Sequence, residues 1–100
     1  MSRKYRVRVF GFDPASGQTA EGPRVGFWTT RYLKAGGEAH AADLAVRMVL
    51  SEEHLAEVVK AEWHGQPVVR ATEVVEIESF DGIAVPGAGY AFFEETDEPQ

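Results

Sequence analysis

The adjacent polar residues Thr29, Thr30 and Arg31 have the clearest spacing for binding chemistry in this chain. Two hydroxyls beside a guanidinium could bind a phosphate or a carboxylate, because arginine forms paired hydrogen bonds with both anions. The alternative to anion binding is a purely structural role for these residues. Threonine is a good strand residue, and Arg31 could instead pair with an acid on the following helix.

Arginine and aromatic side chains also recur at every second position in two segments. Arg6 and Arg8 alternate in the first segment, and Trp28, Thr30 and Tyr32 alternate in the second. A period of two places such residues on one face of a strand. Clusters of exposed aromatic residues commonly mark interaction sites. The candidate binding residues are therefore Arg6, Arg8, Trp28, Thr30, Arg31 and Tyr32.

Residues for metal binding or covalent catalysis follow no recognisable pattern. His40, His54 and His64 are too far apart in sequence to form an i, i+4 pair on one helix face, which is the spacing that zinc-binding helices use. The chain contains no cysteine, and its serines form no nucleophile motif. We therefore predict no catalytic residue, no metal site and no cofactor.

Four strands and one helical region are expected to position the candidate residues. Alternating, aromatic or β-branched segments predict strands over residues 4–12, 25–34, 68–79 and 90–93. Apolar residues at helical spacing predict helix over 38–62. Ser51 followed by acidic residues resembles a second helix start with Ser51 as its N-cap, so we expect one long helix with a break there or two consecutive helices.

This order of elements, ββαββ, predicts an α+β domain whose antiparallel sheet has the strand order 2-1-3-4 and carries the helix on one face. The crossover should be right-handed. Strand 3 then lies beside strand 1, and Arg6 and Arg8 should face Glu76 and Glu78 across the two strands. Glu73 interrupts the apolar alternation of strand 3, which predicts a β-bulge near Thr72–Val74.

Composition predicts a single domain over residues 1–93, because 44% hydrophobic residues in 100 suffice for one core. Residues 94–100 read as a disordered acidic tail. The net charge is −6. Residues 1–34 hold seven basic and two acidic side chains, and residues 35–100 hold three basic and fourteen acidic ones. We expect the two halves to neutralise each other within one fold rather than to act as a basic arm and an acidic tail.

Nothing in the sequence predicts a membrane location. No apolar run approaches the length of about 20 residues that a spanning helix needs, and the first residues lack the apolar stretch of a secretory signal. The absence of cysteine is compatible with a reducing cytoplasm. We therefore expect a cytoplasmic protein.

The segment Gly26–Ala35, which reads Gly-Phe-Trp-Thr-Thr-Arg-Tyr-Leu-Lys-Ala, resembles a segment that recurs in uncharacterised bacterial proteins of about this length. Those proteins look similar in their basic first strand, Ala/Glu-rich helix, acidic strand and late Gly-x-Gly-aromatic ending, here Gly87–Phe92. Members often carry an acidic cap before the helix, where this chain has Gly36 and Gly37. The resemblance implies a fold and no activity.

These observations favour a non-catalytic protein-interaction or self-assembly module that uses its open sheet face or an edge strand. A two-fold homodimer would cover Trp28, Tyr32 and Phe10. The alternative is binding of single-stranded nucleic acid or a small anionic ligand on the aromatic and arginine face. The net charge of −6 argues against nucleic acid. A small enzyme is the weakest of the alternatives.

Overall fold

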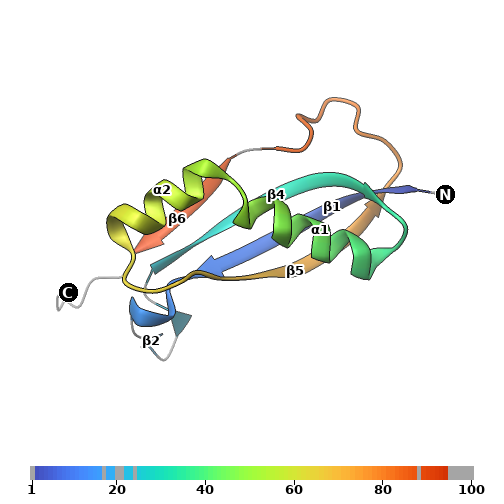
Figure 1. The fold of residues 1–100 in the computed structure, drawn as a ribbon. Helices are drawn as coiled ribbons and strands as arrows, with labels where there is room; N and C mark the ends of the chain where they lie inside the picture. Colours follow the sequence, from blue (N-terminus) through green and yellow to red (C-terminus); the bar gives the residue numbers. More distant parts are fainter. Residues whose placement is uncertain (1, 17, 20–21, 24, 88, 95–100) are drawn as a thin grey trace.

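The computed structural model describes residues 2–16, 18–19, 22–23, 25–87 and 89–94 (Figure 1). Its elements are, in chain order, β1 (Arg3–Phe12), the 3-10 helix η1 (Pro14–Ser16), β2 (Gln18–Thr19), β3 (Gly22–Pro23), β4 (Val25–Ala35), α1 (Glu38–Leu50), α2 (Glu53–Glu62), β5 (Val68–Ile77) and β6 (Tyr90–Glu94). The predicted acidic tail therefore begins inside a strand at Glu94, and its remaining residues lie outside the described part of the chain.

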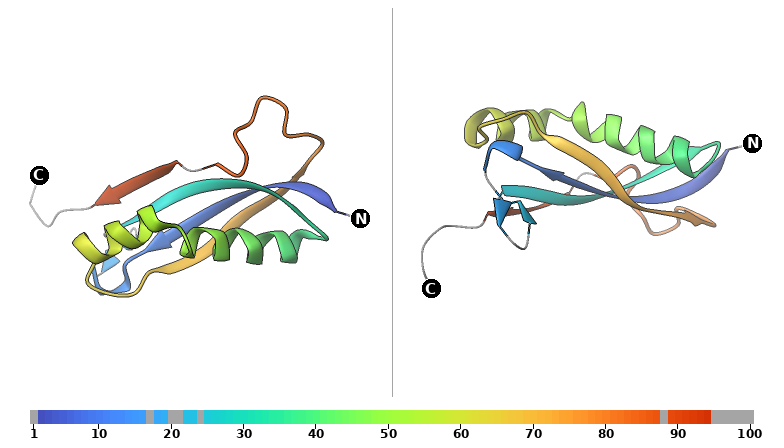
Figure 2. Two further views of the ribbon diagram at one scale, coloured as in Figure 1. Left: turned by 45° about the horizontal axis from the view of Figure 1, so that its top comes forward. Right: turned by 90° about the horizontal axis from the view of Figure 1, so that it is seen from below.

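Four strands form one antiparallel sheet in the order β5-β1-β4-β6, and β2 and β3 pair as a separate two-stranded ribbon. Both helices lie on the same side of the four-stranded sheet (Figure 2). The predicted α+β class, the antiparallel sheet and the position of β1 between β4 and β5 are confirmed.

The position of the last strand differs from the predicted order. We expected the strand that follows Ile77 to lie beside β5, but β6 pairs with β4, from Thr29 opposite Tyr90 to Val25 opposite Glu94. Gly26 makes room for it, because a Cβ at Gly26 would lie 2.6 Å from the Phe93 ring. The connection from β5 also runs along the outer edge of β4, where the Tyr32 amide donates to the Pro86 carbonyl at 2.9 Å.

The core lies between the helices and the sheet. Small or branched residues of α1, at the helical spacing that the sequence predicts, meet the odd-numbered residues of β1 and β4. Each fully buried large apolar side chain stabilises the fold by about 1.5–3 kcal/mol relative to an exposed one. The buried cluster consists of Tyr5, Val7, Val9, Phe27, Leu33, Ala35, Ala41, Ala45, Val49, Leu55 and Trp63.

The predicted bulge in the third long strand is confirmed, and it changes which acid faces the arginines. Arg8 lies opposite Glu73 and Val9 opposite Ala71, so Thr72 is the extra residue. The extra residue reverses the alternation beyond it. The expected pairing of Arg6 and Arg8 with Glu76 and Glu78 is therefore wrong: Glu76 lies opposite Tyr5, and β5 ends before Glu78.

The predicted helical region breaks into two helices at Ser51, as one of the two alternatives expected. Ser51 caps the C-terminus of α1, where its hydroxyl donates to the Met48 carbonyl at 2.9 Å. It is not the N-cap of α2, because Glu52 occupies that position. The side chain of Glu52 is thereby left to contact β4.

Candidate functional site

The side of the sheet turned away from α1 and α2, here called the open face, carries five of the six predicted binding residues. Arg6 lies opposite Tyr32, Arg8 opposite Thr30, and Phe10 opposite Trp28. Opposed residues of an antiparallel pair point to the same side of the sheet. The period of two that predicted this grouping from the sequence therefore brings Arg6, Arg8, Trp28, Thr30 and Tyr32 together.

The connection between β5 and β6 turns this part of the open face into a hollow. The hollow has a volume of about 860 Å³. The predicted residues line it together with Glu73 and with the connecting segment, which contributes Gly82, Ile83, Ala84 and Gly87. The segment lies so close to β4 that a Cβ on Gly87 would be 3.0 Å from the Thr30 carbonyl oxygen. This side of the hollow was not predicted from the sequence, because the segment between β5 and β6 has neither strand nor helix periodicity.

Aromatic rings and guanidinium groups stack along the open face next to the hollow. The rings of Phe10 and Trp28 lie 4.5 Å apart, and the Arg8 guanidinium carbon lies 4.7 Å from the centre of the Trp28 ring. Phe93 stacks on Phe10 at 6.0 Å. Arg70 extends the row, at 5.9 Å from the Phe10 ring. Such cation–π contacts hold the arginines against the sheet while their N–H donors stay near solvent.

The open face is basic. On β1, β4 and β5 it carries five basic side chains and one acidic side chain: Lys4, Arg6, Arg8, Lys34, Arg70 and Glu73. Glu73 pairs with Arg6, whose Nη2 donates to Oε1 of Glu73 at 3.2 Å. The expected pairing would have placed two acids, Glu76 and Glu78, on this face, whereas the bulge at Thr72 places Glu73 there instead. The open face therefore carries an excess of positive charge on a protein of net charge −6.

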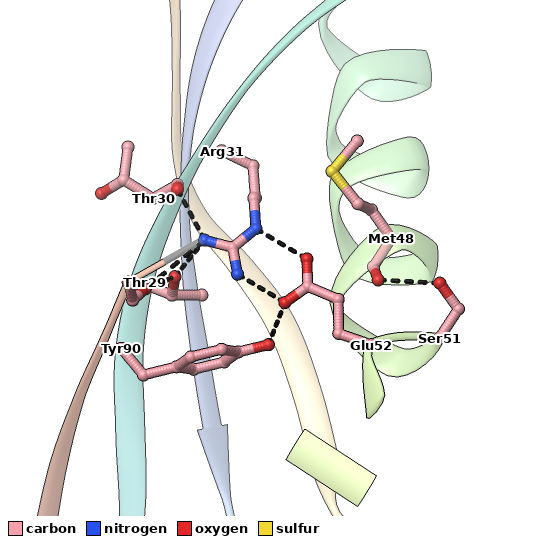
Figure 3. Close-up of polar contacts among 8 residues, drawn as sticks. Thr29, Thr30, Arg31, Met48, Ser51, Glu52 and Tyr90 are labelled. Atoms are coloured by element: carbon pink, nitrogen blue, oxygen red, sulfur yellow. Dashed lines mark hydrogen bonds and ion pairs between the residues drawn. The ribbon is translucent and has the colours of Figure 1, made fainter. Parts of the chain in front are cut away.

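Arg31, the sixth predicted residue, lies on the opposite side of the sheet and is fully buried (Figure 3). Its Nε and Nη2 donate to the two carboxylate oxygens of Glu52, at 3.0 and 2.6 Å. Its Nη1 donates to the Thr30 carbonyl at 2.8 Å and also to the Thr29 hydroxyl. Each nitrogen of the guanidinium is thus hydrogen-bonded within the chain. This is the structural alternative that the sequence left open.

Tyr90 completes the cluster around Arg31. Its hydroxyl donates to Glu52, and the Arg31 guanidinium carbon lies 5.1 Å from the centre of its ring. Burial alone would raise the pKa of Glu52, but hydrogen bonds from Arg31 and Tyr90 and the positive charge of Arg31 outweigh it and lower the pKa. Burial raises the pKa of the Tyr90 phenol above its ordinary value, and the hydrogen bond to Glu52 raises it further.

The buried acid Asp13 joins two loops at one end of the sheet. Its Oδ1 accepts from the Ala15 amide at 2.9 Å, a local turn bond of a kind that aspartate commonly forms. Its Oδ2 accepts from the His64 amide at 2.8 Å, and the Gly65 amide also donates to Oδ1. Asp13 therefore ties the β1–β4 connection to the loop after α2. Its hydrogen bonds with backbone amides account for its burial.

The described residues also hold histidine and acidic side chains outside the open face and the Arg31 cluster. That part of the chain holds no group of three or more histidine, aspartate or glutamate side chains that could bind a metal ion. The exposed His54 ring contacts the rings of Tyr90 and Phe92, at 5.5 and 5.9 Å. No helix within the described ranges is long and apolar enough to cross a membrane.

Comparisons with known proteins gave no match. No family model matches the chain, and neither the curated proteins nor the solved structures contain a matching protein. The resemblance of Gly26–Ala35 to a segment of small bacterial proteins stays a prediction. The function must therefore be inferred from the open face itself.

Proposed function

We propose that this protein is a non-catalytic binding module whose open face binds an acidic, partly apolar segment of a partner protein. The observation that carries the proposal is the basic, aromatic hollow, in which Arg8 and Trp28 stack beside Tyr32. The excess of positive charge on this face complements an acidic segment. The stacked rings offer apolar contact area of the kind that interaction surfaces use.

The charge of the open face weighs against a face-to-face homodimer. A two-fold axis through this face would bring Arg6 and Arg8 of one copy near the same residues of the other, together with Lys4, Lys34 and Arg70. Like charges opposed at an interface are destabilising. The self-assembly alternative predicted from the sequence therefore loses support at this face, although it does not depend on this face alone.

Single-stranded nucleic acid is the second candidate, and the basic charge of the open face favours it. Three features favour the protein segment instead. Arg8 and Phe10 already contact the Trp28 ring, which limits its use as a base-stacking platform. Arg6 is paired with Glu73. The overall charge of −6 repels an oligonucleotide, which carries a charge on every nucleotide, more strongly than a peptide in which only alternate residues are acidic. A cytoplasmic location remains part of the proposal, and the cysteine-free composition is compatible with it.

The proposal is tested by binding assays with two probes, a short peptide in which glutamate alternates with phenylalanine and an oligothymidylate of the same length. Arg8→Glu should weaken peptide binding by at least about tenfold, because it replaces a charge-assisted contact with repulsion. Lys60→Glu makes the same charge change on the exposed side of α2 and should leave binding unchanged. Equal loss in both variants would contradict a localised site. Tighter binding of the oligonucleotide would favour the second candidate.

A further inference from the structure

In the part of the chain that the structure describes, β5 forms an edge of the sheet with no strand on its outer side. Among the described residues, β5 pairs with β1 alone, and it is ten residues long. An unpaired strand edge presents backbone donors and acceptors that can pair with a further strand. The sequence of β5 indicates which strand that would be.

The eight residues from Val68 to Val75 form a charge-complementary palindrome. They read Val-Val-Arg-Ala-Thr-Glu-Val-Val. Reversing the order exchanges Arg70 with Glu73 and the small residues Ala71 and Thr72 with each other, and it leaves the valines in place. In an antiparallel pair centred between Ala71 and Thr72, every valine would therefore meet a valine and every charge its opposite.

Such a pair also requires opposed residues to lie on the same side of the sheet. In a regular strand, residues 70 and 73 would lie on opposite sides. Here the bulge at Thr72 places both on the open face, because Arg70 lies opposite Phe10 and Glu73 opposite Arg8. The same bulge places Val69 and Val74 together on the helix side of the sheet. The palindrome and the bulge thus agree in register, although they are independent features of the strand.

We propose that β5 pairs antiparallel with β5 of a second copy of this chain, about a two-fold axis between Ala71 and Thr72. Arg70 of each copy then lies opposite Glu73 of the other, which gives two identical ion pairs. Val68 meets Val75 and Val69 meets Val74, twice each. Glu73 can accept the new bond while it holds Arg6, because a carboxylate has about four acceptor positions.

The bulge makes this edge selective for its own copy. A bulge interrupts the regular spacing of backbone groups and discourages pairing with an ordinary flat strand. When the second strand carries the same bulge at the matching position, opposed residues of the two strands again lie on the same side of the sheet. The resulting eight-stranded sheet would keep both pairs of helices on one side and both open faces on the other, so the dimer leaves the proposed binding surface uncovered.

Charge reversal at the two central positions tests the proposal by sedimentation equilibrium up to millimolar concentration. The wild type should approach twice the chain mass of 11.0 kDa. Arg70→Glu and Glu73→Arg should each raise the dimer dissociation constant at least about tenfold, because each places two like-charged pairs at the centre. The double variant Arg70→Glu/Glu73→Arg should restore dimerisation. Lys60→Glu and Glu57→Arg on α2 are the matched controls and should dimerise like the wild type.

Two further measurements extend the test, and the second uses the wild type alone, so it does not depend on Glu73→Arg, a variant that loses the bond to Arg6. A mixture of the two single variants should form heterodimers, since each supplies the charges that the other needs. In the wild type, hydrogen exchange of the amides over 68–75 should slow as concentration rises. A mass that stays at 11.0 kDa at millimolar concentration, or a dimer indifferent to these charges, would overturn the proposal. Neither result depends on the binding function of the open face.

Discussion

The carboxylate of Glu52, at the break between the two helices, holds the buried guanidinium of Arg31 on β4 through two hydrogen bonds of 3.0 and 2.6 Å. Arg31 is fully buried, and the Glu52 side chain is one quarter exposed. The pair fixes the start of α2 against the sheet, and Tyr90 joins it from β6. Arg31, which suggested binding of an external anion from the sequence, therefore binds a carboxylate of its own chain.

Breaking this pair should destabilise the protein unequally, depending on which partner is removed. Glu52→Ala leaves a buried positive charge without its partner and should lower the free energy of unfolding by about 3–5 kcal/mol. Arg31→Met leaves a carboxylate that water can reach and should cost less. Urea unfolding measures both values.

The exposed pair of Asp43 and Arg47 on α1 supplies the matched control. Asp43→Ala and Arg47→Ala should each change the free energy of unfolding by less than about 1 kcal/mol. The double variant Arg31→Met/Glu52→Ala should lose less than the sum of its single variants, because the two groups interact. Strict additivity would argue that the pair does not act as a unit.

The lowered pKa of Glu52 predicts a specific dependence of stability on pH. Because the folded-state pKa lies below the ordinary value of 4.5, the contribution of the ionised group is complete above that value. It is lost as the pH falls through the folded-state pKa. The difference in unfolding free energy between the wild type and Glu52→Gln should therefore be largest near neutral pH and shrink below 4.5. A difference that grows on acidification would contradict the contact.

The partly buried Tyr90 and the buried Tyr5 should respond differently to loss of the hydroxyl. Tyr90→Phe removes a hydrogen bond to a charged group and should lower the free energy of unfolding by about 1.5–3 kcal/mol. The Tyr5 hydroxyl is buried and has no hydrogen-bond partner in the described structure. Tyr5→Phe should therefore leave stability unchanged or raise it by about 1 kcal/mol. Thermal unfolding of the two variants side by side checks the contrast.

The alternation of Arg6 and Arg8 with apolar residues was sufficient to predict β1 and the faces of its side chains, because a half-buried strand has a period of two. The same rule placed Trp28, Thr30 and Tyr32 together. The period of two did not predict the faces of β5 correctly, because the bulge reverses the alternation along that strand. The sequence indicated an irregularity near Glu73, but the position of a single extra residue decides whether Glu73 or Glu76 faces the arginines.

The place of β6 could not be read from local pattern either. Its five residues fit either edge of the sheet by composition. The outcome depends on long-range contacts, such as the space left by Gly26 for Phe93 and the bond from Tyr90 to Glu52. Gly89 contributes in the same way, because its carbonyl accepts from the Thr29 hydroxyl. None of these pairings has a signature in the sequence near either partner.

The role of the open face is tested most directly by mapping amide chemical shifts of the protein during titration with the alternating glutamate and phenylalanine peptide. The shifts should concentrate at the residues that line the hollow, which include Arg6, Arg8, Trp28, Thr30, Tyr32, Gly82, Ile83, Ala84 and Gly87. Raising the salt concentration should reduce them, because the attraction is partly between charges near solvent. Shifts confined to α1 and α2, or no shifts at millimolar peptide, would contradict the assignment of the open face as the binding surface.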